Sequence, residues 1–215
     1  MPGFSLWLVP RPASPEAAQL RALIASLSAP LGAPVFAPHV TLLGVIAVAA
    51  DGGADAGEGA GADAPAALLA RARALARSAP LRALRGLRAG FACAEGGATE
   101  FRCVYLRLDE PALAALLPAR AAALASFPRH GEAPGEAFMP HLSVLYSAAL
   151  PAGAPRAELA AAPDVQAALQ LAPLALPRLE LWDTTSPDAA SWSLVEGWEL
   201  CDGGDDDGGA RAASS

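Results

Sequence analysis

Two eight-residue segments of this chain share one pattern, and that pattern constrains the fold more than any other feature. The segments are Phe36-Ala37-Pro38-His39-Val40-Thr41-Leu42-Leu43 and Phe138-Met139-Pro140-His141-Leu142-Ser143-Val144-Leu145. Each reads aromatic residue, one further residue, Pro, His, apolar residue, hydroxyl residue and two apolar residues. The chain has three histidines, and two of them hold the same place in this pattern, 102 residues apart. We therefore expect the fold to bring the two segments face to face.

The apolar and β-branched residues after each histidine predict a β-strand, because such side chains fit a pleated, half-buried surface. Successive side chains of a strand point to opposite faces. His39 and Thr41 therefore share one face of the first strand. His141 and Ser143 likewise share one face of the second strand. A proline at the first position of a strand leaves no ladder hydrogen bond unmade. Each strand thus presents one imidazole and one hydroxyl in the same direction.

An imidazole–hydroxyl pair on each strand suggests acid–base chemistry. An imidazole titrates near neutral pH, so it can give or take a proton, and a hydroxyl can donate a hydrogen bond to an anionic oxygen. Two such pairs facing each other across a groove supply an acid, a base and two donors. This set suits in-line displacement at phosphorus. One histidine in an apolar strand is usually a core residue, but the repeated pattern favours the functional interpretation.

Composition limits the classes of partner. The chain has 215 residues, of which 53% are hydrophobic, enough for one core or two fused lobes. The net charge of −7 argues against a surface that binds nucleic acid, so we expect no stable nucleic-acid partner.

The chain has three cysteines, Cys93, Cys103 and Cys201, and an odd number opposes a complete disulfide framework. With no signal-peptide pattern and no apolar run of membrane-spanning length, we expect a cytoplasmic protein without a membrane partner.

The order of predicted elements suggests two related halves. Besides the two histidine strands, at 39–48 and 141–146, strands are predicted over 4–9, 81–92, 101–108, 174–182 and 192–200. Helices are predicted from Ser14-Pro15, over 66–79, from Asp109-Glu110-Pro111 and from Pro163-Asp164. The expected fold class is α+β. It has two lobes related by a pseudo-two-fold axis, each an antiparallel sheet with helices outside, and a central groove that carries both histidine strands.

Two segments rich in Gly and Asp interrupt this organisation. Residues 49–64 are predicted to form a flexible insertion, and residues 202–215 a disordered acidic tail, because neither can bury enough apolar surface to become ordered. The rest, residues 1–201, is predicted to be one domain.

The doubled segments, with Pro38-His39-Val40-Thr41 and Pro140-His141-Leu142-Ser143 at their centres, resemble the H-x-T/S signature of the 2H phosphoesterase superfamily. Residues Phe4–Pro10, Phe101–Leu106 and Met139–Tyr146 resemble strands of the plant- and yeast-type cyclic phosphodiesterases. The resemblance covers roughly residues 4 to 200, apart from the insertion. It implies hydrolysis of a small cyclic phosphate with no metal and no cofactor. The implied substrates are ADP-ribose 1″,2″-cyclic phosphate, a by-product of tRNA splicing, and nucleoside 2′,3′-cyclic phosphates, which open to 2′-phosphates.

The resemblance also implies roles for individual residues. His39 and His141 correspond to the acid–base pair, with the assignment of base and acid left open. Thr41 and Ser143 correspond to the residues that bind the phosphate oxygens.

Three aromatic residues, Trp7, Phe101 and Tyr146, correspond to positions that line the substrate cleft. Strict alternation places Tyr146 on the face opposite His141, so it reaches the cleft only if the strand bends or ends before it.

The protein is expected to be a monomer.

Three other interpretations compete with this one. His39, His130 and His141 could bind zinc, although no close metal-binding spacing supports such a site. The protein could trim the 3′ end of RNA, an activity that usually requires a basic groove. It could also bind a nucleotide phosphate without catalysis.

Overall fold

The computed structural model describes residues 3–47, 65–128, 130–131 and 137–200. The predicted insertion and the predicted tail lie outside the described residues. Within the described part of the chain, no helix is long and apolar enough to cross a bilayer.

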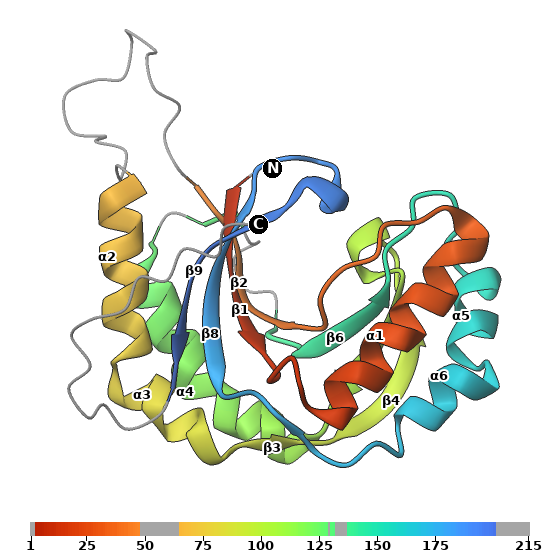
Figure 1. The fold of residues 1–215 in the computed structure, drawn as a ribbon, viewed down its shortest axis with the longest axis horizontal. Helices are drawn as coiled ribbons and strands as arrows, with labels where there is room; N and C mark the ends of the chain where they lie inside the picture. Colours follow the sequence, from red (N-terminus) through yellow and green to blue (C-terminus); the bar gives the residue numbers. More distant parts are fainter. Residues whose placement is uncertain (1–2, 48–64, 129, 132–136, 201–215) are drawn as a thin grey trace, which may run out of the picture.

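The fold is α+β, as predicted (Figure 1). The strands are β1 (Gly3–Val9), β2 (Val40–Ile46), β3 (Arg88–Ala89), β4 (Phe91–Gly96), β5 (Val104–Leu108), β6 (His141–Leu145), β7 (Leu174–Ala175), β8 (Arg178–Thr184) and β9 (Ser193–Glu199). The helices are α1 (Pro15–Ser28), α2 (Pro65–Ala76), α3 (Ala79–Arg82), α4 (Glu110–Ser126), α5 (Ala154–Ala160) and α6 (Pro163–Ala168). Seven strands form one antiparallel sheet in the order β4-β5-β6-β2-β1-β8-β9, and β3 pairs with β7.

The main sheet differs from the two separate sheets that the sequence suggested. The two histidine strands are neighbours within it, and β2 pairs with β6 through Val40 and Leu142. This pairing merges the two halves, because it joins the edge strand of one half to the edge strand of the other. The two halves therefore meet along the seam that carries both histidines.

The arrangement of helices repeats from one half to the other. Helix α1 connects β1 to β2 and contacts β6, whereas α4 connects β5 to β6 and contacts β2. Each helix thus packs across the seam on the histidine strand of the other half. Both helices start in the same way: the side chains of Ser14 and Asp109 accept hydrogen bonds from the first helical turn, and a proline occupies one of its first positions.

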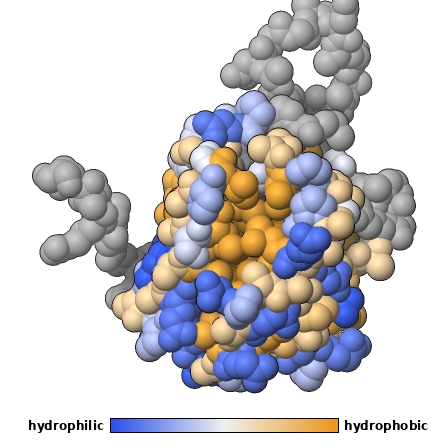
Figure 2. Space-filling view, turned by 90° about the vertical axis from the view of Figure 1, so that its right-hand side faces the viewer, coloured by the Kyte–Doolittle hydropathy of each residue, from blue (hydrophilic) through white to orange (hydrophobic). Residues whose placement is uncertain are grey.

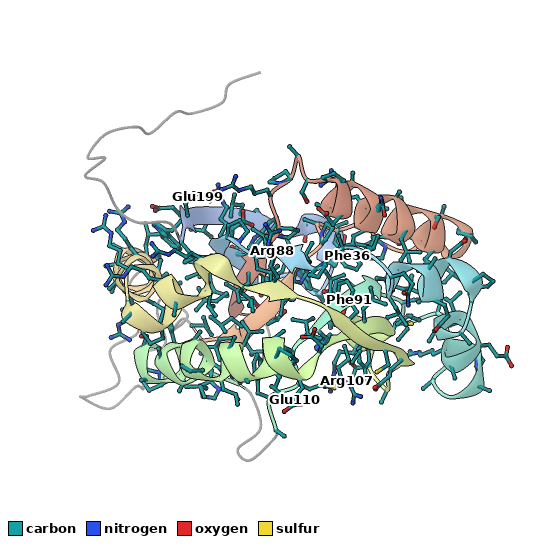
Figure 3. All side chains as sticks on the ribbon, turned by 90° about the horizontal axis from the view of Figure 1, so that it is seen from below. Phe36, Arg88, Phe91, Arg107, Glu110 and Glu199 are labelled. Carbon is teal, nitrogen blue, oxygen red and sulfur yellow. The ribbon has the colours of Figure 1, made fainter. Side chains whose placement is uncertain are left out.

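The register of the sheet repeats as well. Two rows of directly paired residues occupy equivalent places: Glu180–Trp7–Thr41 across β8, β1 and β2, and Glu95–Tyr105–Ser143 across β4, β5 and β6. Directly paired residues point to the same face of a sheet. The opposite face carries the apolar core, in which Leu8, Leu42 and Val144 are fully buried. Side chains fill the space between the strands and the helices, and Phe36 lies in this interior (Figure 3).

Three predicted strands are wrong in their extent. Residues 174–182 do not form one strand: β7 ends at Ala175 and pairs with β3, and β8 begins at Arg178, after Pro177, which has no N–H to donate to a sheet. Residues 81–92 do not form one strand: Leu81 belongs to α3, which Pro80 helps to start, and a 3₁₀ turn and the short β3 come before β4. Phe101 was predicted to begin a strand, but Glu100–Arg102 form a 3₁₀ turn and β5 begins at Val104. The turn frees Phe101 from the alternation of β5.

Candidate active site

The structure brings all seven candidate residues together around one pocket of about 790 Å³. These residues are Trp7, His39, Thr41, Phe101, His141, Ser143 and Tyr146. The pocket lies on the polar face of the sheet, over the seam between β2 and β6. On the face of the molecule shown in Figure 2, a hollow has a hydrophobic floor and hydrophilic sides.

Both histidines are held by the same local hydrogen bond. Nδ1 of His39 lies 2.7 Å from the carbonyl oxygen of Ala37, and Nδ1 of His141 lies 2.9 Å from that of Met139. A carbonyl can only accept, so each Nδ1 carries the proton. The neutral imidazoles therefore keep their lone pairs on Nε2. The proline before each histidine favours an extended backbone at the residue whose carbonyl accepts this bond.

His39 is enclosed by aromatic rings. It is 3% exposed, and the Trp7 ring stacks on it at 3.6 Å between centroids and an angle of 9°. Trp182 of β8 stacks with the same indole at 4.4 Å, so Trp7 is sandwiched between them. Burial is the main cause that lowers the pKa of His39, a positive charge on His141 adds to the lowering, and the bond to Ala37 opposes it; together they bring the pKa to about 4. His39 is therefore neutral at pH 7.

His141 lies in a more open environment. It is half-buried, and the Tyr105 ring meets it edge-on at 5.0 Å. Burial lowers the pKa of His141, its bond to Met139 opposes this effect, and the positive charge of Arg102 adds to the lowering. The two imidazoles thus have the same tautomer but different surroundings.

Tyr146 reaches the pocket because β6 ends at Leu145, which is one of the two conditions that the sequence set. Its ring stacks on Phe36 at 3.8 Å, and its hydroxyl lies 3.2 Å from Nε2 of His39. Since Nε2 carries the lone pair, the tyrosine donates this hydrogen bond. Burial raises the pKa of the Tyr146 hydroxyl, which keeps the donor protonated.

The two hydroxyl residues have different partners. Thr41 is half-buried and faces the pocket. Ser143 is 5% exposed, and its Oγ donates to the carbonyl oxygen of Phe101 at 3.0 Å. The Phe101 backbone therefore lies beside Ser143, while its ring contacts Tyr146 and Trp192.

Other residues also line the pocket, and sequence reasoning missed Arg102, Arg120 and Trp192 among them. Trp192 lies just before β9, with ring centroids 5.3 Å from Phe101 and 5.9 Å from Tyr146. Its position in the sequence suggested only the start of a strand. The scarcity of tryptophan, four in the chain, was the one available signal.

Arg120 is a buried cation on α4. It donates to the carbonyl oxygen of Leu42 at 2.6 Å and lies over the Phe138 ring at 5.1 Å. It therefore joins β2 to the segment before His141. Its neighbours in α4 are small or apolar and fit an ordinary helix, so nothing in the sequence indicated that the Arg120 side chain reaches the pocket.

Arg156 holds the turn that carries Phe101 and Arg102 in place. The buried guanidinium of Arg156 donates to four backbone carbonyls, those of Gly97, Thr99, Ser147 and Leu150. Gly97 itself permits the tight turn, because a Cβ there would collide with the carbonyl oxygen of Arg102.

The zinc interpretation requires a cluster of ligands. Over the described ranges, no three His, Cys, Asp or Glu side chains form a group that could hold a metal ion. His130 belongs to an isolated bridge with Ile46 and does not line the pocket. The three histidines therefore do not make a common ligand set.

Comparison with known families agrees with this geometry. The family model described as "Cyclic phosphodiesterase-like protein" matches residues 1–172, which include both histidine segments. Strands β8 and β9 and Trp192 follow the matched region, although both strands belong to the same sheet. No curated protein matches the chain. The chain belongs to the cyclic phosphodiesterase-like family, one of the 2H phosphoesterase families, and is thus a cyclic phosphodiesterase.

Proposed function

We propose that the protein hydrolyses cyclic phosphodiesters by a metal-independent mechanism that uses two histidines. The substrates would be nucleoside 2′,3′-cyclic phosphates, opened to 2′-phosphates, and ADP-ribose 1″,2″-cyclic phosphate, opened to ADP-ribose 1″-phosphate. One observation carries the proposal: two imidazoles with the same tautomer line one pocket, each with a hydroxyl residue two positions later. The family supports the substrate class, a cyclic phosphate.

Substrate binding would create the acid. Both imidazoles have lowered pKa values, so both are neutral at pH 7 without substrate. A cyclic phosphate diester carries one negative charge, and an anion within a few ångström favours the protonated form of an imidazole. One of the two would then take up a proton, which gives one imidazolium and one neutral base.

The reaction would proceed by in-line attack of water on phosphorus. The neutral imidazole would take a proton from the water through Nε2 while the new P–O bond forms. At His39, the Tyr146 hydroxyl would have to turn away from Nε2 before this nitrogen could exchange a proton with the substrate or water. The imidazolium gives its Nε2 proton to the ribose oxygen as the ring P–O bond breaks. The product is a phosphate monoester and a free hydroxyl, and the proton on the histidine pair has moved from one imidazole to the other.

Thr41 and Ser143 would stabilise the charge on the non-bridging oxygens. Ser143 now donates to the Phe101 carbonyl, and rotation about Cβ–Oγ would turn the same hydrogen toward a phosphate oxygen. Donors aimed at developing charge are among the largest contributors to catalysis.

The aromatic residues would divide into two groups. Trp7 and Tyr146 are 3% and 5% exposed, and both contact His39, so they would mainly hold the imidazole. Phe101 and Trp192 are half-buried and would present ring surface to the ribose or the base. Hydrolysis of the ADP-ribose compound would place the enzyme after tRNA splicing.

The repeated register supports a two-lobed mode of action. Each half would act as one lobe and supply one imidazole and one hydroxyl to a central groove along the seam. The single seven-strand sheet supports the proposal that residues 1–201 work as one domain.

The test is turnover by the purified protein in excess EDTA, with 2′,3′-cyclic AMP and ADP-ribose 1″,2″-cyclic phosphate assayed side by side. We expect both to be hydrolysed and the nucleotide to give the 2′-phosphate. Loss of activity in EDTA with recovery on adding zinc would contradict the mechanism, and formation of the 3′-phosphate would contradict the assigned leaving oxygen. A short RNA with a cyclic phosphate end is included, and faster turnover of that RNA would favour RNA processing instead.

A further inference from the structure

Tyr105 holds in the second half of the sheet the place that Trp7 holds in the first. Tyr105 pairs directly with Ser143, just as Trp7 pairs with Thr41. Each ring packs against the imidazole of the neighbouring strand. The Tyr105 ring lies 5.0 Å from that of His141 at an angle of 60°, compared with 3.6 Å and 9° for the stacked pair in the first half.

The two positions differ in how the ring is held. Trp7 is clamped between two rings, whereas Tyr105 is held by a hydrogen bond from its hydroxyl to Oε2 of Glu95, at 2.7 Å. The bond lowers the pKa of Glu95, and burial together with Glu95 raises the pKa of Tyr105 to about 12. The pair therefore stays as a neutral phenol and a carboxylate near neutral pH.

The same hydroxyl also touches the segment that fixes the tautomer of His141. It lies 4.0 Å from Sδ of Met139, and the Met139 carbonyl accepts the bond from Nδ1 of His141. Tyr105 thus contacts both the imidazole and the residue that orients it. It is 6% exposed and is not among the residues that line the pocket, so it acts on the reaction only through its neighbours.

Glu95 is fixed in turn by two neighbours on the same face. Oε1 lies 3.3 Å from a guanidinium nitrogen of Arg107 and 3.1 Å from Sγ of Cys93. The Arg107 side chain is 45% exposed and lies at the margin of the molecule in Figure 3. Since exposed ion pairs contribute little, the hydrogen bond to Tyr105 is the main function left for the carboxylate.

We propose that Tyr105, anchored by Glu95, is a positioning residue that holds the His141 imidazole with Nε2 directed at the substrate. The inference rests on the proposed acid–base role of His141. It adds a residue pair on β4 and β5 that lies outside the pocket and sets the geometry inside it.

The test separates the hydroxyl from the ring. Tyr105→Phe keeps the ring and removes the hydrogen bond to Glu95. We expect kcat for 2′,3′-cyclic AMP to fall about tenfold, because one hydrogen bond that aligns a catalytic group is lost. KM should stay within about twofold of wild type. Glu95→Ala should match Tyr105→Phe. Glu95→Gln keeps an oxygen that accepts the bond and should restore most of the activity. The double variant Tyr105→Phe/Glu95→Ala should be no slower than either single variant, because the two residues act as a unit.

Several outcomes overturn the inference. Wild-type kcat in Tyr105→Phe would do so, as would equal loss in Glu95→Gln and Glu95→Ala, or effects that multiply in the double variant. If Tyr105→Phe does not fold, the comparison of Glu95→Gln with Glu95→Ala decides alone. His141→Ala is assayed alongside: full activity in that variant would refute the proposed function, whereas an inactive His141→Ala beside an unaffected Tyr105→Phe would refute only the inference.

Discussion

Replacing Tyr146 with phenylalanine removes one hydroxyl that touches His39 and keeps the ring that stacks on Phe36. The hydroxyl donates to Nε2, and a hydrogen bond to the neutral form of a group disfavours its charged form. A neutral hydrogen bond contributes about 1 kcal/mol, and one pKa unit corresponds to about 1.4 kcal/mol. We therefore expect Tyr146→Phe to raise the pKa of His39, now about 4, by about 0.7.

The assay is an NMR titration of the histidine Cε1 protons. Three histidines give three resonances, and the variants His130→Ala and His141→Ala assign them. Tyr105→Phe is the matched control, because the chain has two tyrosines and Tyr105 contacts the other imidazole of the pocket. It should leave the pKa of His39 unchanged.

An unchanged or lower pKa of His39 in folded Tyr146→Phe would refute this reasoning. It would mean that the tyrosine does not donate to Nε2. The tautomer derived from the Ala37 carbonyl would then be in doubt.

Three further predictions follow from the same contacts. Arg156→Met should lower the free energy of unfolding, measured in urea, by about 3–5 kcal/mol, because the backbone carbonyls that the guanidinium binds would lose their hydrogen-bond donor. A loss below about 1 kcal/mol would contradict this role. Arg102→Gln should raise the pKa of His141, seen by NMR, because it removes a positive charge that opposes the imidazolium; a lower value would reverse the assigned sign. His39 binds a proton below pH 6.5 in the unfolded chain but only below about pH 4 in the folded protein. The free energy of unfolding should therefore fall by up to about 3 kcal/mol as the pH drops from 6.5 to 4. The variant His39→Gln should show a smaller change over the same pH range.

The sequence predicted the parts of the site that depend on local pattern. Alternation along a strand placed His39 with Thr41 and His141 with Ser143, and the pocket contains both pairs. The repeated segments predicted two related halves, and the register of the sheet repeats. Helix starts were also readable, since a capping side chain followed by proline acts within one turn.

The remainder depended on contacts between distant residues. One backbone pairing, Val40 with Leu142, merges two expected sheets into one, and no local pattern signals it. Tyr105 and Arg107 bind Glu95 from the neighbouring strand, and the carbonyls that bind Arg156 lie outside its own helix, so these roles could not be read from spacing. Trp192 reaches the pocket from the far end of the chain for the same reason.

The central claim is that His39 and His141 carry the reaction without a metal. The most direct measurement is kcat for 2′,3′-cyclic AMP in excess EDTA for His39→Ala, His141→Ala and His130→Ala, with folding checked by circular dichroism. Proton-transfer groups contribute about 10²–10⁴-fold, so the first two variants should each lose at least about 100-fold, while His130→Ala, whose side chain lies outside the pocket lining, should stay within about twofold of wild type. Turnover near the wild-type rate in either His39→Ala or His141→Ala would contradict the account.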